Sequence, residues 1–220
     1  MGKDNNSKDK SLKNLWYLKS SGILFIVYLI FSYIVNKDIF RTADYDIMVF
    51  LQEKISRLFD MPFSLFTVIG SSEVTLFFCL LFFIYFIVKR KHLFLGIGLF
   101  FLIMVIEMIG KFTIYHPKPP NIFFRYSLDL HLPSGYIVDT HFSYPSGHMA
   151  RATFITVVFL FLILQKNESR YKNWISFLFI CLFIAGMFIS RIYLGEHWIT
   201  DVIGGVLLGG SVGMLSLYFW

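Results

Sequence analysis

The chain has 220 residues, of which 56% are hydrophobic and only 15% are charged, and its mean hydropathy is +0.66. This composition is too apolar for a soluble domain and is typical of a polytopic membrane protein. The formal net charge is +6, but the basic residues form no stripe interleaved with aromatic residues, which argues against a nucleic-acid-binding surface. The two cysteines, Cys79 and Cys181, lie inside apolar runs, which indicates packing residues rather than a disulfide or a metal site.

Residues 1–19 are polar and rich in lysine, and no small-residue cleavage site follows them. We interpret them as an uncleaved cytoplasmic tail rather than a signal peptide. This divides the chain into a basic tail, residues 1–20, and a single six-span domain, residues 21–220. Residues 21–35 form the first and shortest apolar run. Residues 36–62 mix charged and apolar residues at nearly helical spacing, which predicts an amphipathic helix at the membrane interface.

Five further apolar runs follow, and each is near the roughly 20 residues that an α-helix needs to cross a bilayer. The first of them contains Glu73 and is long enough that we expect its beginning to lie at the interface. Together with residues 21–35, the runs predict an all-α bundle of six transmembrane helices with one amphipathic interfacial helix. The five runs are 63–88, 93–110, 149–164, 174–189 and 199–219.

Basic residues in the connecting loops predict the orientation of this bundle in the cell membrane. The N-terminal tail, the loop at Lys89–His92 and the loop at Lys166–Lys172 are rich in Lys and Arg, and such loops face the cytoplasm. Both termini are therefore expected to be cytoplasmic. We expect the three remaining loops to face outward; they are residues 36–62, 111–148 and 190–198. The loop 111–148 contains the turn residues Pro133-Ser134-Gly135 and is long enough to expect a function.

The stretch Ser190–Asp201 places ionisable residues between two apolar runs, where their cost makes them candidates for function. His197 and Asp201 are four residues apart, so on a helix the carboxylate can hold the imidazole. Arg191 is a fixed cation that can bind an oxyanion through two N–H groups. The alternative is an interfacial helix end whose charged side chains reach toward the headgroups.

A second cluster, Pro145-Ser146-Gly147-His148, stands at the beginning of the fourth span. Ser146 is a good helix N-cap, and Gly147 lets a ligand approach the amides of the first helical turn. His148 can give or take a proton beside such an anion site. The alternative is a capped helix whose histidine faces the headgroups.

A third cluster consists of Lys111 and Lys118-Pro119. Lys111 lies one helical turn after Glu107, which predicts an ion pair between them. Taken singly, each lysine is more typical of a headgroup anchor than of a binding site. The predicted topology, however, brings all three clusters to the same face of the membrane, and this convergence favours a common site.

In this combination the chain resembles the type 2 phosphatidic acid phosphatase (PAP2) superfamily, and within it the bacterial phosphatidylglycerophosphatase B type. These lipid phosphatases share a fold with the vanadium haloperoxidases. The family pattern is K-x6-RP, then PSGH, then SR-x5-H-x3-D. Lys118 stands where the family usually has Arg, which keeps the charge but loses the planar fork for phosphate. The pattern here reads Lys111-x6-Lys118-Pro119, Pro145-Ser146-Gly147-His148 and Ser190-Arg191-x5-His197-x3-Asp201.

The resemblance implies a hydrolase that works through a phosphohistidine. His197 would attack phosphorus, with Asp201 fixing its tautomer. His148 would protonate the leaving oxygen and then activate water. Neither a metal nor another cofactor is expected, because the surrounding cations would repel a metal ion. The phosphate oxygens would be held by Lys111, Lys118, Ser146, Gly147 and Arg191.

The substrate implied is a lipid phosphate in the bilayer, and phosphatidylglycerophosphate, phosphatidic acid and undecaprenyl diphosphate all fit. Two alternatives stay open: transfer of the phosphoryl group to an acceptor other than water, and a catalytically silent lipid-binding or transport protein of the same fold. The presence of His148, His197 and Asp201 together favours an enzyme. No pattern in the sequence indicates a nucleic-acid partner or an oligomeric state.

Overall fold

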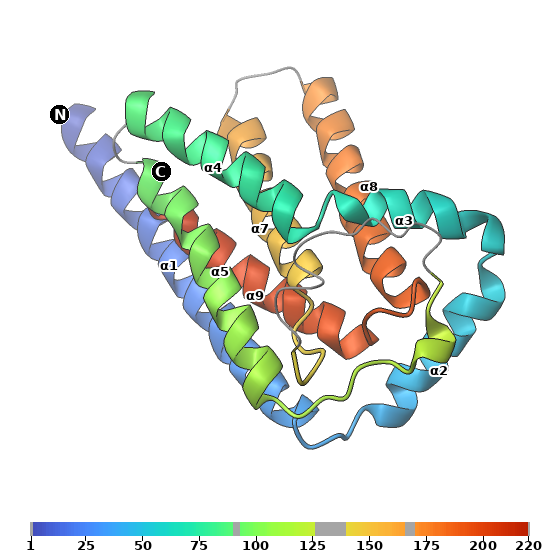
Figure 1. Cartoon of the computed structure of the whole chain (residues 1–220). Coiled ribbons are helices and arrows are strands. Elements are labelled where there is room, and N and C mark those ends of the chain that lie inside the picture. Colours follow the sequence, from blue (N-terminus) through green and yellow to red (C-terminus); the bar gives the residue numbers. More distant parts are fainter. Residues whose placement is uncertain (1, 90–92, 126–139, 166–169, 220) are drawn as a thin grey trace.

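A computed structural model describes residues 2–89, 93–125, 140–165 and 170–219. Within these ranges every regular element is helical, and six segments are long and apolar enough to cross a membrane, so the predicted all-α six-span bundle is confirmed. The predicted turn at Pro133-Ser134-Gly135 lies outside the described residues, as do residues 90–92 and 166–169 of the basic loops. The long helices are α1 (Gly2–Val35), α2 (Arg41–Lys54), α3 (Asp60–Val68), α4 (Ser72–Lys89), α5 (Leu93–Thr113), α7 (Gly147–Gln165), α8 (Arg170–Tyr193) and α9 (Ile199–Leu217) (Figure 1).

The first span is longer than the sequence predicted. Helix α1 is continuous from Gly2, and its membrane-spanning part, Leu12–Val35, has 24 residues. Residues 3–19 contain neither Pro nor Gly and are rich in Lys and Leu, so nothing breaks the helix before the apolar run begins. The prediction that this span is the shortest is therefore wrong. The boundary after residue 20 and the cytoplasmic location of the tail stay predictions.

The second predicted run, 63–88, is divided into α3 and α4 by a turn at residues 69–71. Gly70 in this turn packs against α7 and α8, because a Cβ placed on it would lie 3.0 Å from Met187 Cε and 3.3 Å from His148 Cδ2. Ser71 Oγ then accepts a hydrogen bond from Val74 N at the beginning of α4. The turn thus places the backbone of Gly70 next to His148.

The predicted amphipathic helix is present as α2, although it is shorter than the stretch 36–62. It buries Asp44 and Met48 and leaves Tyr45 and Phe50 exposed. The chain reverses before it at Asp38, which has a positive φ of 57°. Asp44 thereby faces the bundle, where it meets α9.

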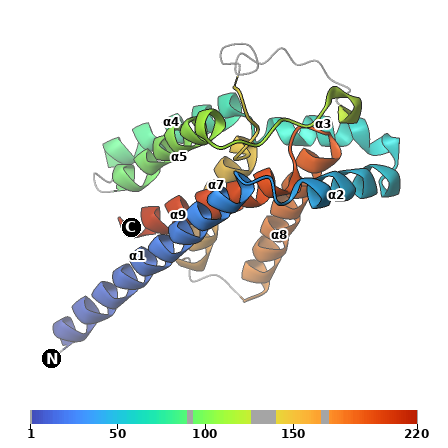
Figure 2. The same cartoon turned by 90° about the horizontal axis from the view of Figure 1, so that it is seen from below.

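Helix α9 lies at the centre of the bundle, against α1 and α7 (Figures 1 and 2). Gly205, Gly209 and Gly213 recur every four residues on its α7 face, and a Cβ on Gly213 would lie 3.0 Å from Val157 Cβ. Small residues at this spacing let two membrane helices approach closely. Ser146 N donates to Asp201 O at 3.0 Å, so the first turns of α7 and α9 lie side by side.

Candidate active site

Backbone hydrogen bonds bring the three predicted clusters together. Besides the bond between Ser146 and Asp201, Phe142 N donates to Lys111 O at 3.1 Å. Trp198 Nε1 donates to Pro117 O at 2.7 Å, which joins the segment after α5 to the loop before α9. The convergence that the loop charges predicted is therefore present in the structure.

His197 and Asp201 form a pair in the first turn of α9. Nδ1 of His197 is 3.2 Å from Oδ2 of Asp201, and this oxygen also accepts a hydrogen bond from Trp198 N at 3.0 Å. The loop before the pair turns at Gly195, whose φ is +75°. A Cβ at this position would overlap the carbonyl oxygen of Phe123, so only glycine fits here. With Nδ1 engaged by the carboxylate, Nε2 is left for another atom.

The surroundings of His197 favour its uncharged form at neutral pH. Burial, followed by the charges of Arg191, Lys111 and Arg151, holds the pKa of His197 well below its ordinary value. A neutral imidazole keeps its lone pair, which is the form that a nucleophile requires.

The beginning of α7 supplies polar groups without partners. Ser146 is fully buried, and among the described residues its Oγ has no hydrogen-bond partner. Gly147 is the first residue of α7, so the amides of the first turn have no partners within the helix. His148 follows, and it lies close enough to interact with the charges of Arg191, Arg151 and Lys111. An unpaired hydroxyl and helix amides beside cations are suited to an anion.

Two of the cations share one buried carboxylate. Lys111 Nζ is 2.7 Å from Oε1 of Glu107, as the sequence predicted, and Arg151 Nη1 is 2.6 Å from Oε2. This carboxylate lies directly against Gly147, where it would overlap any Cβ. Arg151 was not among the predicted site residues. Its signal was a charge inside an apolar run, one helical turn after His148.

Arg191 is 1% exposed and occupies the end of α8. Its Nη2 pairs with Glu196, and its Nη1 donates to Thr67 Oγ1 at 2.5 Å. Neither partner was predicted, because Thr67 is distant in the sequence and Glu196 resembles any interfacial charge.

Lys118 differs from the other cations because it is exposed. It follows Pro117, whose carbonyl is bound by Trp198 Nε1 next to His197. The structure thus places Lys118 at the rim of the site, whereas Lys111, Arg151 and Arg191 lie within it.

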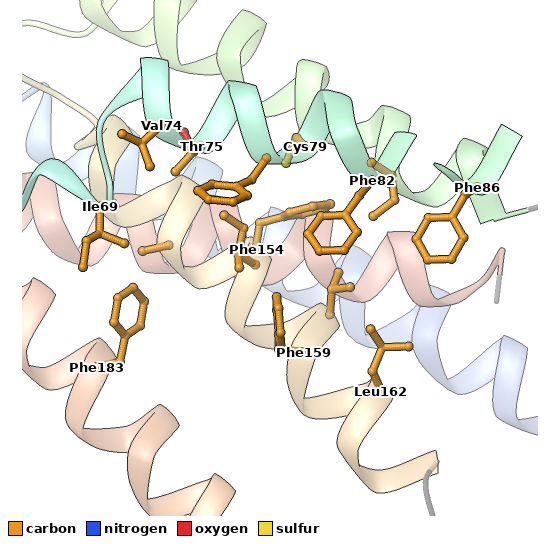
Figure 3. A pocket seen from close by; sticks show the side chains of 15 residues that line it. Ile69, Val74, Thr75, Cys79, Phe82, Phe86, Phe154, Phe159, Leu162 and Phe183 are labelled. Atoms are coloured by element: carbon orange, nitrogen blue, oxygen red, sulfur yellow. The ribbon is translucent and has the colours of Figure 1, made fainter. Parts of the chain in front are cut away.

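Figure 3 shows an apolar cavity. Its volume is about 430 Å³, and its lining residue Ile69 precedes Gly70, which packs against His148. It lies between α4, α7 and α8, with Ile69 near one end (Figure 3), and Ala152, one turn after His148, is among the residues that line it. From Ala152 to Leu162 the cavity follows α7 for about 15 Å at 1.5 Å per residue. Within the described ranges, no three His, Cys, Asp or Glu side chains are grouped so that they could hold a metal ion.

Comparison with known proteins identifies the class to which this fold and these motifs belong. A family model described as the PAP2 superfamily matches residues 92–220. The match covers more than half of the chain, and the chain therefore belongs to this superfamily.

Two curated relatives share 35% identity with the chain over 78 residues. One is phosphatidylglycerophosphatase B of Bacillus subtilis (strain 168), of which the match covers 36%, with 32% of this chain. The other is undecaprenyl-diphosphatase of Sulfolobus acidocaldarius, of which it covers 34%, with 36% of this chain. The chain therefore spans about a third of the length of these relatives.

Two solved structures share the fold. The transmembrane PAP2 type phosphatidylglycerolphosphate phosphatase of Bacillus subtilis has a TM-score of 0.69 at 22% identity, with 90% of this chain and 94% of that chain covered. Aquifex aeolicus LpxE has a TM-score of 0.52 at 26% identity, with 79% of this chain and 93% of that chain covered. Both matches extend well beyond the motifs, over most of the six-span bundle.

Proposed function

We propose that this membrane protein is a lipid phosphatase that hydrolyses a phosphate or diphosphate group from a lipid through a phosphohistidine at its outer face. The observation that carries the proposal is the geometry of His197, whose Nδ1 lies 3.2 Å from Asp201 Oδ2 and whose surroundings include the cations Arg191, Lys111 and Arg151. A nucleophile oriented by a carboxylate beside preorganised positive charge is what phosphoryl transfer requires.

In the proposed first step, Nε2 of His197 forms a bond to phosphorus while the bond from phosphorus to the lipid oxygen breaks. A protonated His148 gives its proton to that oxygen, and the lipid product leaves as an alcohol or, from a diphosphate, as a monophosphate. In the second step, His148 takes a proton from water, the water oxygen bonds to phosphorus, and the bond from phosphorus to His197 breaks. Inorganic phosphate leaves, and both histidines return to their first states.

The negative charge of the phosphoryl group would be distributed over the groups at the beginning of α7 and the ends of α5 and α8. Ser146 Oγ and Gly147 N would donate hydrogen bonds, and Lys111 and Arg191 would supply positive charge. Lys118, at the rim, would contact the phosphate or the headgroup from outside. Such fixed donors cost no reorganisation when charge develops, and they typically provide the largest part of catalysis.

The apolar cavity supports a lipid as the substrate. Its lining residue Ile69 precedes Gly70, which packs against His148, and the lining is almost entirely apolar. A hydrocarbon chain lying along α7 would leave its phosphate beside the histidines. Phosphatidylglycerophosphate, phosphatidic acid and undecaprenyl diphosphate all have this combination of apolar chain and terminal phosphate.

The proposal can be tested by phosphate release from these three lipids, using the full chain purified in detergent. Wild-type protein should release phosphate, and His197→Ala should lose at least about 10³-fold in kcat, as expected for a missing nucleophile. His141→Ala is the matched control, because His141 is an exposed histidine that packs on Phe112 outside the site. It should keep the wild-type rate.

Three results would contradict the proposal. Absence of phosphate release from every lipid would favour a silent lipid-binding protein. Release that requires an added alcohol would instead favour a phosphotransferase. A His197→Ala protein with more than a tenth of the wild-type rate would remove His197 from the nucleophile's role.

A further inference from the structure

A third histidine lies behind the pair formed by His197 and Asp201. His116, in the segment that follows α5, is 3% exposed. Its Nε2 is 3.4 Å from Oδ1 of Asp201 and 3.0 Å from Oγ1 of Thr200. Its backbone carbonyl accepts hydrogen bonds from both N and Oγ of Ser143, at 3.0 and 3.1 Å. His116 is therefore fixed at its backbone and faces α9 with one ring nitrogen.

Asp44 of α2, which is 1% exposed, lies beside the same ring nitrogen of His116, with its Oδ2 3.7 Å from Nε2. Thr200 N donates to Oδ1 of Asp44 at 3.0 Å, and Thr200 Oγ1 is 2.9 Å from both carboxylate oxygens. Burial raises the pKa of Asp44 to about 6, so it is ionised at neutral pH and can only accept. The hydroxyl proton of Thr200 therefore points to Asp44, and Thr200 Oγ1 is left to accept from His116.

The other ring nitrogen defines the tautomer of His116. Nδ1 is buried and has no hydrogen-bond partner among the described residues. An orphaned N–H is rarer in protein interiors than an orphaned lone pair, and burial lowers the pKa of His116 to about 4. The ring is thus neutral, with its hydrogen on Nε2, directed between Thr200 and Asp201.

We propose that His116 is a positioning residue that orients Asp201 for the nucleophile His197. Oδ2 of Asp201 accepts from Trp198 N and lies 3.2 Å from Nδ1 of His197, whereas Oδ1 has no hydrogen-bond partner among the described residues and lies 3.4 Å from Nε2 of His116. An N–H that faces this otherwise unpartnered oxygen attracts it and opposes rotation of the carboxylate, so Nδ1 of His197 stays the donor and Nε2 keeps its lone pair. Through Thr200 and Asp44, the same contacts join the interfacial helix α2 to the site. This inference rests on the proposed function of His197.

The test compares two substitutions of His116 in the full chain. His116→Gln keeps a side-chain N–H donor, whereas His116→Leu has a similar size and no donor. The outer hydrogen-bond partners of metal-bound histidines typically contribute about 10–100-fold to activity, and by that comparison His116→Leu should lower kcat by at least about tenfold and change KM by less than about threefold. His116→Gln should stay within about threefold of the wild-type kcat, because it restores the donor.

Two further measurements separate positioning from packing and from titration. Ser211→Ala is the matched control, since Ser211 is also buried on α9 and donates to Ser21 O at 3.1 Å, away from the histidines; its kcat should equal that of wild type. The pH profile of His116→Gln should overlay that of wild type, because a neutral His116 does not titrate in the working range. If His116→Leu does not fold, Thr200→Val and Thr200→Ser replace the pair, and only Val should lower kcat.

If the wild type is active and the folded His116→Leu protein has the same kcat, this inference alone is overturned. The same holds if folded Gln and Leu proteins are equally impaired, or if the Gln profile is shifted along the pH axis. No phosphate release by the wild type would overturn the proposed function and this inference together.

Discussion

Each of the three cations within the site already has a carboxylate partner. Glu107 is shared by Lys111 and Arg151, and Glu196 pairs with Arg191. Buried charges are costly unless they are paired, so these carboxylates hold the cations in place. A phosphate group can then meet positive charge that is already oriented.

The shared carboxylate makes Arg151 important for stability. Arg151→Met leaves Glu107, which is 8% exposed, with Lys111 alone, and breaking a buried pair on one side costs about 3–5 kcal/mol. In detergent, Arg151→Met should have a clearly lower unfolding temperature than wild type, and adding Glu107→Gln should partly restore that temperature. Arg41→Met is the control, because Arg41 pairs with Asp38 at the surface. Equal unfolding temperatures for the two Met proteins would contradict this account.

In the proposed mechanism, the acid limb of kcat/KM reports the protonation of His197 in the free protein. Protonated His197 cannot attack phosphorus, and burial with nearby cations keeps the pKa of His197 well below its ordinary value. Activity should therefore persist as pH falls through about 6.5, the ordinary histidine value, and be lost only at lower pH. Measuring two substrates whose phosphate groups have different pKa values separates a titration of the protein from a titration of the substrate. An acid limb at about pH 6.5 with both substrates would contradict the prediction.

At the scale of the elements, the site depends on the close approach of α7 and α9. A Cβ on Gly209 would overlap the Ala150 backbone carbonyl of α7, two residues after His148, whereas one on Gly210 would meet only Leu24 Cδ1 at 3.7 Å and Thr153 Cγ2 at 4.0 Å. Gly209→Ala should destabilise the protein by about 1–3 kcal/mol, the cost of overpacking, and lower kcat because α7 must shift. Gly210→Ala should be neutral or slightly stabilising. Thermal unfolding and phosphate release on both proteins check this, and equal behaviour would refute it.

Much of this arrangement could be predicted from the sequence, because the motif residues are local signals. His197 and Asp201 are four apart, and Glu107 and Lys111 are four apart, so helical spacing alone places each pair in contact. The partners from distant helices could not be predicted in this way. Arg151, Thr67 and Asp44 acquire their roles only when helices pack, and His116 looked like one more residue of a loop.

The errors in the predicted elements have the same origin. Apolar periodicity marks where a span can lie, but it does not mark where a helix stops. Polar residues at the beginning of α1 continue the helix because nothing in them breaks it. The run 63–88 is broken at Gly70 because the bundle places His148 and Met187 there, and this contact is not visible in the local sequence.

For the whole molecule, the loop charges predict cytoplasmic termini and an outward-facing site. In a background with Cys79→Ala and Cys181→Ala, a cysteine at Ile122, which is 87% exposed beside the site, should react with an impermeant thiol reagent in intact cells. A cysteine at Lys89, the last residue of α4, should react only after permeabilisation. The reverse pattern would show an inverted topology, and labelling of both in intact cells would rule out the six-span arrangement.

The central claim is that phosphate is carried by His197, and the most direct measurement is to trap that intermediate. Protein mixed with a lipid diphosphate labelled in its terminal phosphate should be quenched in alkali, where phosphohistidine survives, and the labelled peptide identified. His148→Ala should accumulate more label than wild type, because the leaving group needs little protonation whereas hydrolysis needs the base. The account predicts the label on His197, stable in alkali and lost in acid, and none in His197→Ala. Label on another residue, or phosphate release at the wild-type rate from His197→Ala, would contradict it.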